Sequence, residues 1–210
     1  MKIPKTRVTG NLEENLPEPT KEDMITKTGK LFNILDYLEF SDTYVETGTA
    51  MGESIRRALL AGYKHIYSVD IYEPFVVAMR LKYTMAEIHL GKSYDMLPLM
   101  LERANKNSVI FLDAHPAGPN TGGHAELMQG NMEFSQDNIL ERELKVISDI
   151  TYKTIHRHLI IIDDQDINSA LKFAGFINYA FPFDYKFSLW NEQLEDGILY
   201  KDKILVCEPC

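Results

Sequence analysis

The sequence predicts an α/β fold with a doubly wound, mostly parallel sheet and helices on both of its faces. Between residues 43 and 163, short apolar segments alternate with segments of helical periodicity, the pattern of consecutive βαβ units. Two apolar segments, 108–113 and 158–163, are nearly continuous, as expected of strands buried on both faces. We therefore expect right-handed crossovers and a ligand site at the carboxyl ends of the strands.

The expected elements follow in chain order. A helix is expected to begin near Thr20 and Asp23, with one apolar face made of Leu31, Ile34, Leu35 and Leu38. The five strands that come next are expected at 43–47, 65–70, 88–90, 108–113 and 158–163. Helices are expected at about 52–62, 73–86, 94–104, 138–153 and 166–175. Two later strands, 185–190 and 197–206, form a hairpin-like pair that adds an antiparallel strand at one sheet edge, the second strand being interrupted at 201–203.

Length and composition bound the domain organisation and the partners. The 210 residues are enough for one substantial core, so a single domain at 21–210 is expected, preceded by a flexible arm at 1–20. A net charge of −9 without a Lys/Arg stripe disfavours nucleic acid and anionic membranes as partners. A cytoplasmic protein is expected, because neither a secretory signal nor a membrane span is evident and Cys207 and Cys210 make no disulfide framework. The two thiols are expected to be free, and a homo-oligomer is compatible with the sequence.

The segment that runs from Tyr44 to Ser54 predicts a ligand-binding turn. Glu46 lies at the end of a strand, and Gly48 and Gly52 lead into a helix, where backbone N–H groups and the positive helix end meet. The glycine spacing is not the dinucleotide fingerprint G-x-G-x-x-G, and the Glu46 carboxylate would repel a phosphate but suit an ammonium or sulfonium group. Asp70 ends the next strand, where an acidic residue accepts hydrogen bonds from ribose hydroxyls. An adenosine-type ligand is predicted; the alternative is a glycine-containing turn that binds nothing.

Acidic residues at two later strand ends predict a metal site. Asp113 ends the fourth strand, and Asp163 and Asp164 end the fifth. Carboxylates gathered at one sheet edge repel one another and need protons, positive side chains or a cation. Their oxygens suit Mg²⁺ or Ca²⁺, and such an ion would lower the pKa of a bound hydroxyl. The alternative is that one aspartate caps the following helix and another faces solvent.

His115, two residues after Asp113, is the candidate general base. His124 and Glu126 are further candidates in the 116–137 segment, whose length predicts a lid-like loop over the site. For either histidine, the alternative is a hydrogen-bonded structural residue. Core packing, rather than a pocket lining, is expected for the aromatic residues Phe181, Phe183, Tyr185, Phe187 and Trp190.

Four segments resemble the class I S-adenosylmethionine (SAM)-dependent methyltransferases. They are Glu46-Thr47-Gly48-Thr49-x-x-Gly52, Tyr67-Ser68-Val69-Asp70, Phe111-Leu112-Asp113-Ala114-His115 and Ile161-Ile162-Asp163-Asp164, within residues 43–165. The resemblance implies a Rossmann-like sheet of seven strands with the last one antiparallel. It also implies that the cofactor is SAM and that it is bound by Glu46, Gly48, Thr49, Gly52, Ser54, Asp70, Ser93 and Asp113.

Within that class, the acids after strands four and five are similar to those of divalent-metal-dependent O-methyltransferases. This implies Mg²⁺ or another divalent cation on Asp113, Asp163 and Asp164, with Asp113 and His115 as catalytic residues. Two positions depart from the pattern: Lys92 stands where many members have an acid near the adenine, and Pro116 where catechol-type enzymes place a lysine base.

The predicted function is metal-assisted O-methylation of a small polar acceptor such as a sugar or a natural product. A nicotinamide-dependent oxidoreductase is the first alternative, and the turn's glycine spacing and Glu46 disfavour it. The second alternative is a non-catalytic, Rossmann-like binding or scaffold protein, which the intact Gly48, Gly52 and Asp70 disfavour.

Overall fold

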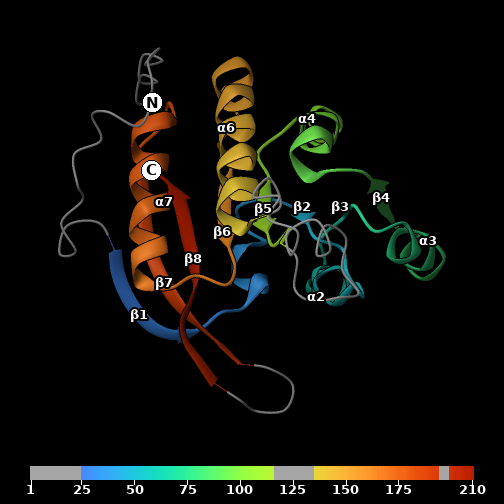
Figure 1. Cartoon of the computed structure of the whole chain (residues 1–210), viewed down its shortest axis with the longest axis horizontal. Coiled ribbons are helices and arrows are strands. Elements are labelled where there is room, and N and C mark those ends of the chain that lie inside the picture. Colours follow the sequence, from blue (N-terminus) through green and yellow to red (C-terminus); the bar gives the residue numbers. More distant parts are fainter. Residues whose placement is uncertain (1–24, 116–134, 194–198) are drawn as a thin grey trace. The chain divides into compact units, whose positions relative to one another are not determined.

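The computed structural model describes residues 25–115, 135–193 and 199–210 (Figure 1). These residues form two compact units, one spanning Ile34–Ile147 and the other containing residues 25–33 and 148–210. We refer to them as the 34–147 unit and the 148–210 unit. The predicted arm at 1–20 lies outside the described residues, as does most of the predicted lid, including His124 and Glu126. The prediction of a single domain stays a prediction.

The 34–147 unit contains four parallel strands in the order β5-β2-β3-β4. They are β2 (Thr43–Thr47), β3 (His65–Asp70), β4 (Ala86–Leu90) and β5 (Val109–Leu112). Every residue of β2 and of β5 is buried, which confirms the expectation that the apolar segment at 108–113 is an interior strand. Because the strands run in one direction, Thr47, Asp70 and Leu112 end at the same edge.

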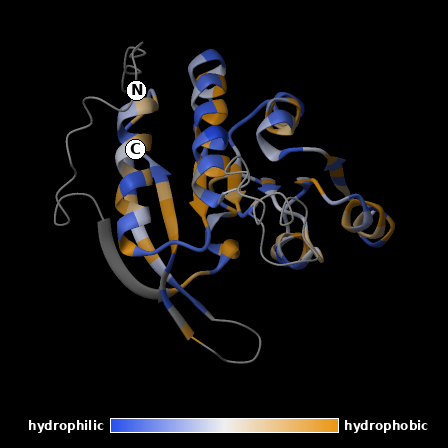
Figure 2. Ribbon diagram, viewed as in Figure 1, coloured by the Kyte–Doolittle hydropathy of each residue, from blue (hydrophilic) through white to orange (hydrophobic). Residues whose placement is uncertain are grey.

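Helices precede, connect and follow these strands, as the alternating pattern predicts. They are η1 (Ile34–Tyr37), α2 (Glu53–Ala61), α3 (Glu73–Lys82), α4 (Ser93–Ala104) and α6 (Gln136–Thr154), of which residues up to Ile147 belong to this unit. Gly62 ends α2 in a left-handed conformation and donates its N–H to Ala58 and Leu59, as expected of a C-terminal glycine. Figure 2 shows α6 with hydrophobic colour on one side and hydrophilic colour on the other.

The 148–210 unit contains strands in the order β1-β7-β8-β6 together with the helix α7. Their bounds are β1 (Ile25–Leu31), β6 (Leu159–Ile162), α7 (Ile167–Ala180), β7 (Tyr185–Gln193) and β8 (Leu199–Pro209). Strand β8 runs antiparallel to both β6 and β7, and β1 is parallel to β7. Asp166 caps α7 by accepting the N–H groups of Asn168 and Ser169. All five aromatic residues expected in the core are buried here.

The structure confirms the predicted fold class, α/β with seven mostly parallel strands (β2 to β8) of which the last is antiparallel. Three predictions about individual elements are wrong. The predicted first helix is replaced by β1 and η1, since Ile25–Leu31 pairs with β7 while Leu31 and Leu35 stay exposed. The predicted helix at 73–86 ends at Lys82. Strand β8 lies between β6 and β7 rather than at an edge. It runs without a break from Leu199 to Pro209, and the expected interruption at 201–203 appears as a shift of register in its pairing with β7, between Tyr200 and Ile204.

No helix among the described residues has the length and hydrophobicity that crossing a membrane requires.

Candidate functional site

The turn after β2 is built from left-handed backbone. Gly48 has φ +86° and Gly52 φ +75°, and between them Ala50 has φ +41°, a conformation unusual for a residue with a side chain. A Cβ atom at position 48 would lie 2.5 Å from the backbone oxygen of Asp113, so only glycine lets the end of β5 pass this close. Strain of this kind persists where the surroundings enforce it and is common at ligand sites. The turn predicted from sequence is therefore present, in a strained form.

Asp70 holds this turn in place from the end of β3. Its Oδ2 accepts the Ala50 N–H at 2.8 Å, and its Oδ1 accepts the Tyr72 N–H at 2.8 Å. The first bond ties the carboxylate to the strained residue between the two glycines. Each carboxylate oxygen has a second lone pair, so Asp70 keeps the capacity to accept hydroxyl groups from a ligand.

Glu46 is fully buried within β2, and hydroxyl groups surround it. Ser68 Oγ donates to Glu46 Oε1 at 2.7 Å, and Ser54 Oγ donates to Glu46 Oε2. Thr49 Oγ1 lies 2.5 Å from Ser68 Oγ and extends the network into the turn. Burial raises the pKa of Glu46 to about 7, although hydrogen bonds from Ser54 and Ser68 act in the opposite direction. Three predicted cofactor residues, Glu46, Thr49 and Ser54, thus belong to one hydrogen-bonded network.

A second buried carboxyl group, that of Glu143 on α6, lies beside Thr47 and Ser93. Burial raises the pKa of Glu143 to about 7, and the hydroxyl groups of Ser93 and Thr47 act in the opposite direction. Ser93 is the first residue of α4 and a predicted cofactor residue. Glu143 itself is not among the predicted site residues.

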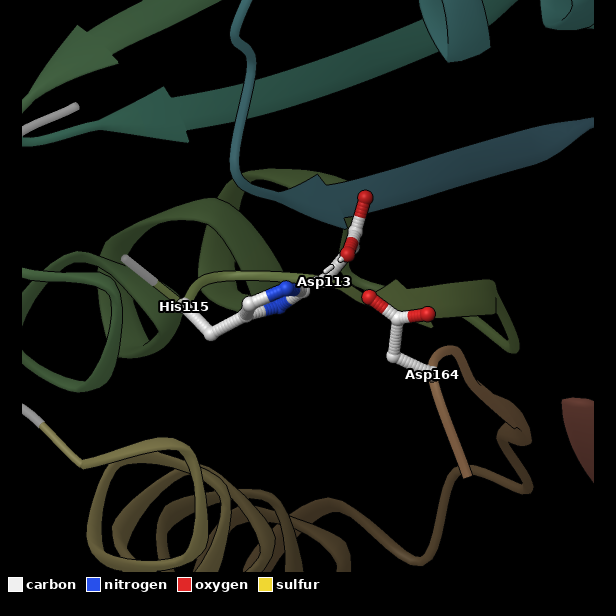
Figure 3. A group of neighbouring side chains, drawn as sticks. All are labelled: Asp113, His115 and Asp164. Carbon is white, nitrogen blue, oxygen red and sulfur yellow. Dashed lines mark ion pairs between the residues drawn. The ribbon is translucent and has the colours of Figure 1, made fainter. Parts of the chain in front are cut away.

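Asp113 and His115 lie together just beyond the end of β5. His115 Nδ1 is 3.3 Å from Asp113 Oδ1, and Figure 3 marks this ion pair with a dashed line. The Asp113 N–H is shared between the backbone oxygen and the side-chain Oγ1 of Thr47, at 3.2 Å from each. An imidazole whose Nδ1 faces a carboxylate presents its Nε2 as the proton-accepting atom. The structure therefore brings together the two residues predicted to be catalytic.

Asp163 and Asp164 follow β6 in the 148–210 unit, and Figure 3 also labels Asp164. Asp163 Oδ1 accepts the Asp164 N–H at 2.7 Å, and Asp164 has the left-handed φ of +55°. Lys203 Nζ on β8 pairs with Asp164 Oδ1 at 2.5 Å. The Lys203 ammonium group thus relieves part of the repulsion between the Asp163 and Asp164 carboxylates. The proposed metal set, Asp113 with Asp163 and Asp164, draws on both units and stays a prediction.

Ser68 and Glu143 are the polar site residues that the sequence analysis did not single out. For each of these two residues, the sequence contains a pattern from which a polar group at the site could have been predicted. Ser68 is the parallel partner of Glu46 in the β2–β3 ladder, so a polar residue was placed beside a buried acid. Glu143 follows Leu140 by three residues and precedes Ile147 by four, which puts a carboxyl group on the apolar face of a helix.

Comparisons with known proteins bear on the fold. No family model matches the sequence, and no curated protein matches it either. Among solved structures, the SAM-dependent methyltransferase from Agrobacterium tumefaciens aligns with a TM-score of 0.50 at 10% identity, over 83% of this chain and 59% of its own. The chain has the fold of SAM-dependent methyltransferases. At this identity the likeness concerns the fold alone.

Two further structures align with lower scores. A protein from Pyrococcus horikoshii assigned as an RNA methyltransferase gives a TM-score of 0.46 at 13% identity, over 83% of this chain and 77% of its own. A protein from Streptococcus mutans assigned as a methyltransferase, in complex with SAH, gives 0.46 at 12% identity, over 84% and 95%.

Proposed function

We propose that this protein is a SAM-dependent methyltransferase that transfers the methyl group to an oxygen of a small polar acceptor, such as a sugar or a natural product. The observation that carries the proposal is the strained turn at Gly48–Gly52, which Asp70 holds at the carboxyl edge of parallel strands. Ligands of doubly wound sheets bind at this edge. The fold is compatible with this function but does not by itself establish it.

Different residues of the 34–147 unit are proposed to bind different parts of the cofactor. Gly48 and Gly52 admit the methionine end, and Thr49 and Ser54 contribute hydroxyl groups there. Glu46 acts through these hydroxyls, because its side chain is fully buried and hydrogen-bonded to Ser54 and Ser68. Asp70 accepts the ribose hydroxyls, while Ser93 and Asp113 border the site from α4 and β5.

The proposed methyl transfer relies on the pair formed by Asp113 and His115 just beyond β5. When bound, SAM supplies an electrophilic methyl group on a sulfonium centre. The Asp113 carboxylate orients the His115 ring through Nδ1, and Nε2 takes the proton of the acceptor hydroxyl as its oxygen forms the bond to the methyl carbon. The departing thioether carries no charge, so the proton on His115 accounts for the positive charge lost from sulfur. Holding acceptor and methyl donor in line provides a large part of the rate acceleration.

Replacing Asp70 is expected to weaken cofactor binding. Asp70→Asn should raise the dissociation constant for S-adenosylhomocysteine about tenfold or more, because a charge-assisted hydrogen bond contributes about 1.5–3 kcal/mol. Isothermal titration calorimetry measures this change, and Asp95→Asn, an exposed acid in the first turn of α4, is the matched control. If the unaltered protein binds no S-adenosylhomocysteine, the proposed function is wrong. Fluorescence titration with NADH tests the oxidoreductase alternative on the same sample.

A divalent cation is the second part of the proposal, with Asp113, Asp163 and Asp164 as its ligands. Carboxylate oxygens fit Mg²⁺, although Lys203 adds a competing positive charge at Asp164. The ion would lower the pKa of the acceptor hydroxyl.

This cation should be measurable without turnover. Calorimetric titration with Mg²⁺ is expected to show binding to the unaltered protein and none to Asp163→Asn. Glu208→Gln, an exposed acid on β8, is the control and should bind normally. Equal heats for the unaltered protein and Asp163→Asn would contradict this ligand set and leave the SAM site untouched.

A further inference from the structure

Ser68 is a polar residue in the interior of the parallel strand β3. It is fully buried, as is its apolar neighbour Val69, and it lies opposite Glu46 in the β2–β3 ladder. A buried hydroxyl group is destabilising unless hydrogen bonds replace those that it made with water. Ser68 therefore needs hydrogen-bond partners, and the structure provides two.

The Ser68 hydroxyl joins Glu46 to Thr49. Its Oγ lies 2.7 Å from Glu46 Oε1 and 2.5 Å from Thr49 Oγ1. An ionised Glu46 has no proton to give, so Ser68 donates its single hydrogen to the carboxylate and accepts that of Thr49. Hydrogen bonds arranged head to tail in this way polarise and strengthen one another. All three side chains are buried, so water does not compete strongly for these bonds.

Two further residues of β3 hold the backbone of the same turn. The Val69 carbonyl oxygen accepts the N–H groups of Gly48 at 2.9 Å and of Thr49 at 3.2 Å. Asp70 Oδ2 accepts the Ala50 N–H at 2.8 Å. Three consecutive residues of β3, beginning with Ser68, thus hold three consecutive residues of the turn, and the first and the third do so through their side chains.

The anchor at Thr49 matters because the next residue is strained. Ala50 has a φ of +41°, a left-handed conformation that is unfavourable for a residue with a side chain. Such strain persists only where neighbouring contacts enforce it. The bond to Ser68 fixes the chain immediately before Ala50, and the bond to Asp70 fixes Ala50 itself.

We propose that Ser68 is a positioning residue, which fixes Thr49 against Glu46 and thereby keeps the turn in its strained conformation. The structural part stands on hydrogen bonds within the 34–147 unit alone. Its consequence for binding the methionine end of the cofactor rests on the proposed methyltransferase function. The role requires no contact between Ser68 and the cofactor.

The exchange rates of two backbone amides test the proposal without any ligand. The N–H groups of Ala50 and Tyr72 bond to different oxygens of the Asp70 carboxylate, so the Tyr72 amide serves as an internal reference. In NMR measurements of amide hydrogen exchange, Ser68→Ala and Thr49→Val are expected to accelerate exchange at Ala50 about three- to tenfold relative to Tyr72, the range that the loss of one hydrogen bond produces.

Two matched variants separate the hydroxyl group from packing. Thr49→Ser keeps the hydroxyl and should restore the exchange rate of the unaltered protein. Thr43→Val removes a buried hydroxyl of β2 that has no hydrogen-bond partner, and it should accelerate neither amide. Equal acceleration of the Ala50 and Tyr72 amides in Thr49→Val, or none at either, would overturn the proposal, even if Ser68→Ala failed to fold.

Binding provides the second readout and separates the two ends of the cofactor. S-adenosylhomocysteine carries the amino-acid end, and 5′-methylthioadenosine lacks it. In calorimetric titrations, Ser68→Ala and Thr49→Val are expected to raise the dissociation constant for S-adenosylhomocysteine about tenfold and to leave that for 5′-methylthioadenosine unchanged, a split that a general loss of stability would not produce.

The outcomes distinguish the positioning role from the proposed function. Equal losses of affinity for the two ligands would overturn the role of Ser68 at the methionine end. If the unaltered protein binds neither ligand while the Ala50 amide responds as expected, the positioning role stands and the methyltransferase function is wrong.

Discussion

Gly48→Ala is expected to abolish S-adenosylhomocysteine binding and to destabilise the 34–147 unit. The added Cβ would lie 2.5 Å from the Asp113 backbone oxygen and 2.9 Å from the Asp113 carbonyl carbon, and backbone atoms cannot move aside as a flexible side chain does. The left-handed φ of +86° adds about 1–2 kcal/mol for a residue with a side chain. Calorimetry measures the loss of binding, and urea denaturation measures the loss of stability.

Gly62→Ala separates the effect of the steric clash from the effect of the left-handed backbone conformation. Gly62 also has a left-handed φ, +100°, but a Cβ there would meet only Leu38 Cδ2 at an ordinary 3.7 Å. This control should lose about 1–2 kcal/mol of stability and keep its affinity for S-adenosylhomocysteine. Equal affinities of Gly48→Ala and the unaltered protein would show that the end of β5 does not constrain the turn as the structure implies.

His158→Leu is expected to remove a large part of the acid sensitivity of the protein. His158 is 1% exposed, neither ring nitrogen has a hydrogen-bond partner, and burial lowers its pKa to about 3, with the neighbouring His156 contributing. Between pH 6.5 and 3, the unfolded chain binds a proton at this position that the folded protein does not. The free energy of unfolding therefore falls as the pH falls through this window.

The size of this effect can be measured by denaturation at pH 7 and pH 4.5. The free energy of unfolding of His158→Leu, measured relative to that of the unaltered protein, should be about 3 kcal/mol higher at pH 4.5 than at pH 7. The reason is that each pH unit below 6.5 accounts for about 1.4 kcal/mol. Glu46 and Glu143 titrate in both proteins and cancel in the comparison. His158→Gln, which cannot titrate but stays polar, should show the same loss of pH dependence. If neither variant differs from the unaltered protein in its pH dependence, the imidazole is not buried in its neutral form.

The parts of the fold that the sequence predicted are those with local signals. Alternating apolar and helical segments defined β2 to β6, and Gly62 marked the end of α2. The strand β1 was missed because Leu31, Ile34, Leu35 and Leu38 have helical spacing, and its pairing with β7 depends on residues more than 150 positions away. The place of β8 between β6 and β7 was missed for the same reason: strand order is decided by pairing partners, which leave little trace in local sequence.

The candidate site was predictable to a similar extent. Gly48, Gly52 and Asp70 were recognised from spacing, and the structure brings the turn and Asp70 into contact. The sequence did not show that Asp70 bonds to Ala50, nor that both oxygens of Glu46 are taken by Ser54 and Ser68, because side-chain partners are chosen in three dimensions. Glu143 was overlooked since a single acid in an apolar helical face resembles a chance interruption of the pattern.

The position of β8 has a consequence for how the 148–210 unit acquires its structure during synthesis. Strands β6 and β7 are synthesised before β8, but they pair with β8 rather than with each other. Each of them therefore keeps one edge unpaired until residues 199–209 have been synthesised. Strand β1 stays unpaired for longer still, because most of the chain lies between it and its partner β7 in the sequence. Pairings of such long range form slowly and leave unpaired edges exposed meanwhile. This unit is therefore the part of a nascent chain most in need of protection from aggregation.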